Sequence, residues 1–271
     1  MNLDEVMVGR IIDRLLKGED YRDEVVNAIN VEFLDFALVF FRQILEAKMQ
    51  DEALHLAWYK KHFICNPDVA PKEAAIYAGI NEKTIRNIYG RGTKEVILDV
   101  AQNNMDYLEN LLHDLGESEN IGIHLKITHK SISVELDLNE SLVVINALAT
   151  KKIALRGGAW SSVGKKVEKP LLLTLCQKCG VFEGFYSAKT FCKDKSREYR
   201  VEVKLMGKGN PESADAVMAR ESHIFVADTL SDQNKRQLKD WGVAFLELKG
   251  NKHCIDDFRN ILKRLHIPYR T

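Results

Sequence analysis

The sequence contains no uninterrupted apolar run of about 18 residues, which excludes a transmembrane helix. Its first residues, MNLDEVMVGR, are acidic and lead into an amphipathic pattern, so a signal peptide is not expected. The five cysteines form an odd, scattered set. Without an export signal, we expect these thiols to stay reduced in the cytoplasm.

The chain also lacks an excess of charge of either sign, because 39 basic residues balance 39 acidic ones. Any contact with nucleic acid must therefore come from local positive clusters. Cys176 and Cys179 form a C-x-x-C with no second ligand pair at matching spacing, and no two of the eight histidines are four residues apart. Helix packing explains the cysteine pair better than zinc does.

What the chain does have is hydrophobic content, 45% over 271 residues, enough for one large domain or two modest ones. Apolar residues recur every three or four positions over residues 3–63, which predicts helices. Alternating patterns at 121–128 and 132–138 predict a hairpin, and a helix should follow over Glu140–Leu155. The glycines after Arg156 break this pattern. We therefore expect a mainly helical region, 1–155, and a second domain, 156–271.

The stretch from Pro71 to Arg91 resembles a helix-turn-helix. Ala75 supplies a small residue where the helices meet, Gly79 permits positive φ in the turn, and Ile85 and Ile88 have inner-face spacing. The residues expected to face outward suit base edges and phosphates: Asn81, Lys83, Thr84, Arg86, Asn87 and Tyr89. These make a DNA-binding helix the favoured interpretation over an ordinary helical hairpin.

From Ala159 onward the pattern changes to α/β. Ser161 or Ser162 can cap a helix that reaches Cys179, with Pro170 kinking it or delaying its start. Strands are predicted at 181–193, 198–206, 223–227 and 243–248, with helices at 231–241 and 255–265. The expected fold class is thus α+β or α/β, in the order α-β-β-β-α-β.

Glu202 and Lys204 lie two residues apart on a predicted strand, so both side chains share one face. An acid there can hold a divalent metal, and the lysine can orient a water, which is the minimum for metal-dependent phosphodiester cleavage. The E-x-K pattern occurs three times in the sequence. Only this copy follows a strand hairpin and leads into a basic glycine loop, MGKGN.

This arrangement is similar to the PD-(D/E)XK nuclease core. Within that superfamily, the sequence resembles type II restriction endonucleases of the CfrBI kind over about residues 156–250. Four stretches carry the resemblance: WSSVGKKVEKP at 160–170, EVK at 202–204, KLMGKGNPESAD at 204–215 and FVAD at 225–228.

The resemblance implies a homodimer that uses Mg²⁺ to cleave double-stranded DNA at a short site. Glu202 would be a metal ligand, and Lys204 would position the attacking water and offset charge on the phosphorane. Glu168 matches the helix acid that many of these enzymes carry. Three lysines would contact phosphates: Lys165, Lys166 and Lys208.

One departure from the family pattern concerns the metal-binding acid expected on the first strand. The position facing Glu202 falls near Lys189 or Thr190, and neither is acidic. Three accounts are open. Asp194 is the ligand with a shifted hairpin, which we favour; or Glu168 and Glu202 suffice; or a change near 188–191 has inactivated the enzyme.

Two other functions fit the same residues. A DNA-binding regulator would keep the helix-turn-helix and use the α/β part only to dimerise. Glu202 and Lys204 would then be an ion pair on a sheet face, and Glu168 an exposed helix acid. A structure-specific DNA nuclease is the third candidate.

Asp228, at the end of a predicted strand, fits a cap between strand and helix. Bases could be read by the helix at 81–89 or the hairpin at 121–138.

Overall fold

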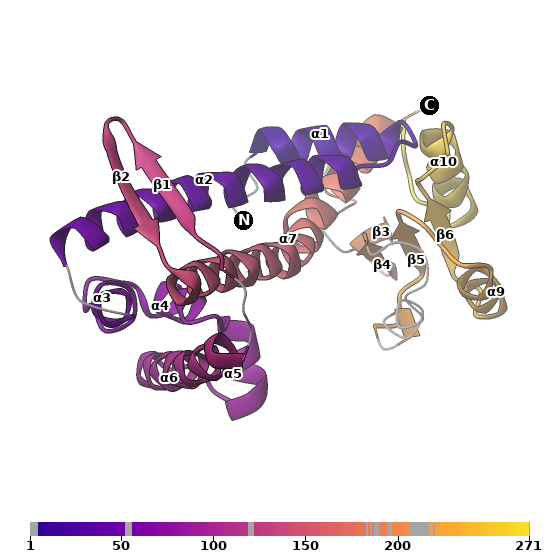
Figure 1. The fold of residues 1–271 in the computed structure, drawn as a ribbon. Coiled ribbons are helices and arrows are strands. Elements are labelled where there is room, and N and C mark those ends of the chain that lie inside the picture. Colours follow the sequence, from indigo (N-terminus) through magenta and orange to yellow (C-terminus); the bar gives the residue numbers. More distant parts are fainter. Residues whose placement is uncertain are drawn as a thin grey trace. The chain divides into compact units, whose positions relative to one another are not determined.

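The computed structural model describes residues 5–51, 56–118, 122–182, 184, 186, 190–194, 197–205, 217–218 and 220–270, with only the backbone at 115–118, 190–194 and 197. The chain forms two compact units, each described separately below. Unit 1 comprises Met1–Ala28 and Gly158–Thr271, and unit 2 comprises Ile29–Gly157. Helices α2 (Arg22–Gln50) and α7 (Leu138–Cys179) contribute to both (Figure 1). The expected division after residue 155 differs in one respect: the first 28 residues belong with the C-terminal part.

Unit 2 is mostly helical. After α2 come α3 (Ala57–Tyr59), a π-helical turn at Lys60–Ile64, α4 (Pro71–Tyr77), α5 (Glu82–Tyr89) and α6 (Lys94–Ser118). Strands β1 (Leu125–His129) and β2 (Ile132–Leu136) pair antiparallel, with Leu125 opposite Leu136, which confirms the predicted hairpin.

An aromatic cluster fills the core of unit 2. Phe40 stacks on Tyr77 at 4.8 Å between ring centroids, and Phe63 packs edge-on against both rings. Glu140 is buried beside this cluster, where its Oε1 accepts hydrogen bonds from Trp58 Nε1 at 2.7 Å and from Lys48 Nζ. Glu140 also exchanges backbone–side-chain bonds with Asp137, a capping box that begins α7.

Helix α7 runs unbroken from Leu138 to Cys179, so the break expected at Gly157–Gly158 and the cap expected at Ser161 or Ser162 are both wrong. Each mid-helix glycine costs about 1 kcal/mol relative to alanine. Burial of Leu155, Ala159 and Val163 on one face offsets that cost. Pro170 lies inside the helix as well.

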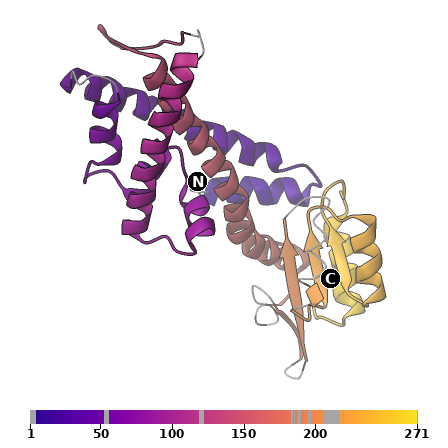
Figure 2. The same cartoon turned by 60° about the horizontal axis from the view of Figure 1, so that its bottom comes forward.

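Unit 1 contains α1 (Glu5–Leu16) and a four-stranded sheet in the order β3-β4-β5-β6. The strands are β3 (Thr190–Asp194), β4 (Arg197–Lys204), β5 (Ile224–Ala227) and β6 (Ala244–Glu247). The β3–β4 pair is antiparallel, and the other two pairs are parallel. Helices α9 (Asp232–Asp240) and α10 (Cys254–Arg264) pack against β6 (Figure 2).

The order of elements in unit 1 agrees with the expected α-β-β-β-α-β series. The first strand is the exception, because β3 begins at Thr190 rather than near Val181. Val181 instead forms an isolated bridge with Tyr269. All four residues of β5 are buried, as expected for a strand in the interior of a sheet. Within the described part of the chain, the longest apolar helical stretches are too short or too charged to cross a bilayer.

At Gly18 the N-terminal segment contacts the loop after β6. The φ of Gly18 is +75°, and its carbonyl oxygen accepts a hydrogen bond from Gly250 N–H at 2.7 Å. A Cβ at Gly18 would lie 2.8 Å from the backbone nitrogen of Asn251, which cannot move independently. At Gly242, with φ +67°, no described atom lies within 4 Å of a Cβ.

Gly18→Ala should therefore destabilise the protein more than Gly242→Ala. We expect about 1–2 kcal/mol for the backbone conformation at either position, and a further 1–3 kcal/mol, roughly, for overpacking at Gly18. Urea unfolding of the two variants measures both values. Equal losses would contradict the close approach at Gly18.

Candidate active site

Strand β4 places Glu202 and Lys204 on the same face of the sheet. Lys204 Nζ lies 3.2 Å from Glu202 Oε1. Glu202 is 7% exposed, an unusual degree of burial for a carboxylate. A carboxylate buried to this extent needs a cationic partner, and Lys204 is one.

Arg220 is a second cation at Glu202, and the sequence contained no signal for it. Its NH1 donates to the same oxygen of Glu202 that Lys204 contacts. Arg220 lies in the turn before β5, 18 residues from Glu202 in the sequence, and its side chain is 58% exposed. Glu202 thus has two cationic partners, one half-buried and one at the surface.

Glu168, on α7, is the carboxylate that the structure brings to this pair. Its pKa is raised to about 7, chiefly by burial and also by the negative charge of Glu202, against the lowering effects of Lys204, Arg220 and a backbone hydrogen bond from Leu205. Gly164, one turn earlier, leaves space for the carboxylate, since a Cβ there would lie 3.3 Å from Glu168 Oε1. Glu168 is therefore not the exposed helix acid of the alternative interpretation.

A pocket of about 590 Å³ opens beside these residues. One face of α7 and the end of β4 form much of its wall, and the N-terminal segment supplies the rest. Its lining residues are Tyr21, Arg22, Trp160, Ser161, Gly164, Lys165, Glu168, Lys204 and Leu205. Three of these are basic and one is acidic, a balance that suits an anionic ligand.

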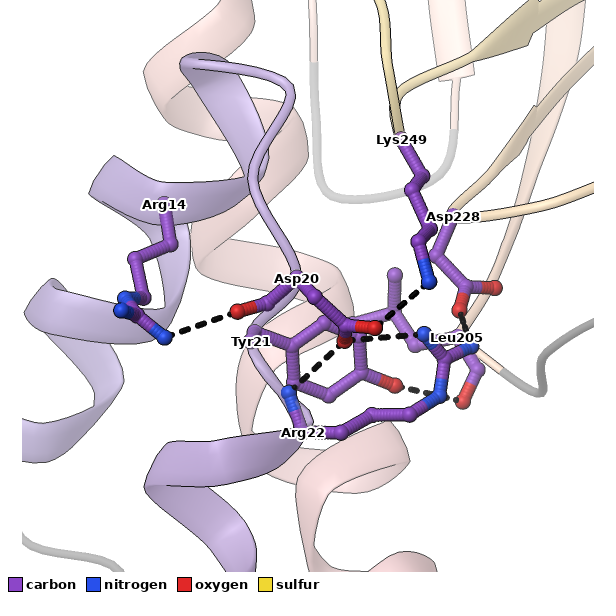
Figure 3. Close-up of polar contacts among 7 residues, drawn as sticks. All are labelled: Arg14, Asp20, Tyr21, Arg22, Leu205, Asp228 and Lys249. Atoms are coloured by element: carbon purple, nitrogen blue, oxygen red, sulfur yellow. Dashed lines mark hydrogen bonds and ion pairs between the residues drawn. The ribbon is translucent and has the colours of Figure 1, made fainter.

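The N-terminal segment is held against the sheet by Tyr21 and Arg22 (Figure 3). The Tyr21 hydroxyl is buried and donates to the carbonyl oxygen of Leu205 at 3.2 Å. Arg22 NH2 donates to Asp228 Oδ2 at 2.5 Å, and its NH1 donates to Asp20 Oδ1 at 2.9 Å. These contacts explain why residues 1–28 belong to unit 1.

Asp228 is therefore not the cap that its position after β5 suggested. It is 1% exposed and is the ion-pair partner of Arg22. Helix α9 is capped instead by Ser231, whose Oγ accepts from Asn234 N–H at 3.1 Å.

The hairpin register argues against Asp194 as a ligand beside Glu202. Asp194 pairs with Arg197, which precedes Glu202 by five residues on β4. At about 3.3 Å per residue this is a separation of about 16 Å along the strand, beyond the reach of a shared metal ion. Thr190 pairs with Arg200, and the described register ends there, so the position opposite Glu202 lies outside the described residues.

The expected phosphate-contacting lysines lie in different surroundings. Lys165 lines the pocket, and Lys166 follows it on the exposed side of α7. Lys208 lies outside the described residues.

The expected DNA-binding residues lie on α5 in unit 2. Ala75 and Ile85 are buried, and Gly79 has φ +82°, all as the pattern predicts. Ile88 is 64% exposed, so its expected inner position is wrong. The Asn81 side chain caps α5, accepting from Thr84 N–H at 3.0 Å. Thr84 is half-buried, and the other expected contacts have exposed side chains: Lys83, Arg86, Asn87 and Tyr89.

Comparison with known families identifies the protein class. The family model of the CfrBI restriction endonuclease matches residues 5–235. The chain belongs to this family. Its members are type II restriction endonucleases, which are site-specific nucleases acting on DNA. The match covers most of the chain, including Tyr21, Arg22 and α5, well beyond the C-terminal stretches that carried the resemblance. No curated protein and no solved structure matches the chain.

Glu168 and Glu202 fit a divalent metal in kind, because both offer carboxylate oxygens and their repulsion helps to raise the pKa of Glu168. In the described part of the chain, no three His, Cys, Asp or Glu side chains are grouped to hold an ion. From the described residues, a metal here would have the two carboxylates of Glu168 and Glu202, and it would compete with Arg220 for Glu202.

The raised pKa of Glu168 should make stability depend on pH. Below about pH 4.5 its carboxyl is protonated in both the folded and the unfolded chain. Between about pH 4.5 and 7 the unfolded chain ionises first, so the free energy of unfolding falls as pH rises, and above that range the loss is complete.

Glu168→Gln should remove this loss. We expect its stability relative to wild type to rise by about 1–2 kcal/mol between pH 5 and pH 8, after allowance for solvent screening. Urea unfolding in EDTA at both pH values measures the difference. A constant difference would show that burial does not perturb Glu168.

Proposed function

We propose that the protein is a Mg²⁺-dependent type II restriction endonuclease that hydrolyses a phosphodiester of double-stranded DNA at a short specific site. The observation that carries this proposal is the placement of Glu168 beside Glu202 and Lys204 at a basic pocket, in a chain of a restriction endonuclease family.

The charged residues in and beside the pocket have distinct parts in the proposed reaction. Glu202 and Glu168 would hold Mg²⁺, which when bound lowers the pKa of a coordinated water and stabilises charge on the phosphate. Lys204 Nζ would orient the attacking water and offset the charge of the phosphorane. Lys165 and, by the resemblance, Lys166 and Lys208 would hold neighbouring phosphates.

The order α7-β3-β4-β5-α9-β6, with Glu202 and Lys204 on the second strand, supports a PD-(D/E)XK core. The exposed polar face of α5 supports DNA binding by an α4–α5 helix-turn-helix. Type II enzymes read two-fold symmetric sites when they act as homodimers, and we expect a homodimer here.

A DNA-binding regulator without catalysis is the second candidate. It is favoured by the ion pairs of Glu202 with Lys204 and Arg220, which satisfy that carboxylate without a metal. Glu202 is a metal ligand in the nuclease and only an ion-pair partner in the regulator, so substitution of Glu202 distinguishes the two functions.

Purified wild-type protein should cut a large plasmid or phage DNA into discrete fragments with Mg²⁺ and leave it intact in EDTA. Glu202→Ala should lose at least about a thousandfold in cutting rate, as expected when a metal ligand is removed, while still shifting DNA in a gel. Glu221→Ala, an exposed acid in the turn that carries Arg220, is the matched control and should cut normally.

Discrete bands would support a site-specific enzyme, and a smear would support an unspecific or structure-specific nuclease. A gel shift without cutting by wild type, with Mg²⁺ or Mn²⁺, would favour the regulator.

Charge reversal at Arg86 tests the role of α5. Arg86 is exposed and pairs with Glu82, one turn away on the same helix, through NH2 at 2.6 Å and Nε at 2.9 Å from Glu82 Oε1. Arg86→Glu should weaken DNA binding about tenfold or more, because a phosphate or base contact is replaced by repulsion. The control is Lys61→Glu, which reverses a charge on another helix of unit 2. Unchanged affinity and specificity in Arg86→Glu would remove α5 as a DNA-binding element and leave the hairpin β1–β2.

A further inference from the structure

Four charged residues form a cluster between the N-terminal segment and the ends of β5 and β6. Asp20 lies just before α2, Arg22 is its first residue, Asp228 follows β5, and Lys249 follows β6 (Figure 3). Lys249 Nζ contacts Asp20 Oδ2 at 2.5 Å, and Arg22 lies between the two acids. The cluster contains two positive and two negative side chains.

Arg22 is fixed in this cluster more firmly than a surface arginine. Its NH1 and NH2 are each bonded to a different carboxylate, and Asp228 is itself buried. Fixing the guanidinium in advance lowers the entropy lost when it binds a ligand. Since a guanidinium has five N–H donors, donors remain after these two bonds.

Arg22 is also a wall residue of the pocket beside Glu168. Arg22 lines it together with Lys165, Glu168 and Lys204, and its side chain is 28% exposed. A planar guanidinium matches the geometry of two phosphate oxygens better than a lysine does. Neutralisation of Asp228 alone does not explain why Arg22 also lines the pocket that contains Lys204.

We propose that Arg22 binds a phosphate of the DNA strand held in this pocket, and that Asp228 and Asp20 are positioning residues that aim its guanidinium. This inference rests on the proposed function, because it takes the pocket as the site of DNA cleavage. The N-terminal segment then completes the active site, with Tyr21 anchoring it to the backbone of Leu205.

The double variant Arg22→Met/Asp228→Asn tests the proposal, because it removes the ion pair as a unit and leaves the net charge unchanged. DNA affinity is measured in a Glu202→Ala background with Ca²⁺, so that no cutting interferes. We expect a loss of about 10- to 100-fold and a salt dependence whose slope falls by about 0.9. Asp228→Asn alone, which keeps Arg22, should lose less.

Arg14 is the matched control. It lies in the same unit, its NH1 also bonds Asp20, through the carbonyl oxygen at 2.8 Å, and its side chain is 32% exposed. It does not line the pocket. Arg14→Met should bind DNA within about twofold of the parent protein, as expected for a residue without a phosphate contact.

A second measurement needs no substitution at the cluster. Arginine-specific labelling with phenylglyoxal, read residue by residue by mass spectrometry, should show that DNA protects Arg22 about tenfold while Arg14 is labelled equally with and without DNA. This comparison decides the matter even if the double variant does not fold.

The outcomes separate this inference from the function on which it rests. DNA binding and cutting by wild type, with unprotected Arg22 or an unaffected double variant, would overturn the role of Arg22 and leave the nuclease intact. Binding with Arg22 protected but no cutting would support the phosphate contact and count against the enzyme. If wild type binds no DNA at all, both proposals fail.

Discussion

The burial of negative charge is the constraint on which unit 1 depends. Asp228 and Glu202 are almost fully buried, and Glu168 is buried enough to shift its pKa to about 7. A buried carboxylate without a partner costs several kcal/mol, so each needs a cation or a proton. Asp228 obtains its cation from Arg22, 206 residues away in the sequence. This pairing explains why the first helix and the start of α2 fold with the C-terminal sheet.

The same constraint shapes the proposed chemistry. Arg22 and Lys204, which neutralise the buried carboxylates of Asp228 and Glu202, also line a pocket that suits phosphate. The same charges can therefore stabilise the fold and bind the substrate. The two partners of Glu202 differ in this respect. Lys204 is half-buried and fixed to the strand, whereas Arg220 reaches in from an exposed turn. If a metal binds Glu202, Arg220 is the partner that can withdraw into water at little cost.

Local patterns in the sequence predicted the order of strands and helices, the hairpin at β1–β2 and the strand that carries Glu202 and Lys204, because periodicity reports which face of an element is buried. They did not predict Arg22 or Arg220 at the site. Nothing in the neighbourhood of an arginine shows that it meets an acid elsewhere in the chain. The sequence placed Asp228 at the end of its strand, but it does not distinguish a capping residue from one in a buried ion pair. At Gly157 and Gly158 the error came from applying propensity where burial of the flanking face decides the structure.

The continuity of α7 determines which acid can stand beside Glu202. The register of β3 and β4 carries Asp194 to the far end of the hairpin, so the strand next to Glu202 contributes no acid among its described residues. Because α7 passes through Ser161 and Ser162 without a break, Trp160, Gly164 and Glu168 share one face and line one pocket. The second carboxylate therefore comes from a helix. Of the three accounts of the missing strand acid, this geometry favours a site built from Glu168 and Glu202 alone.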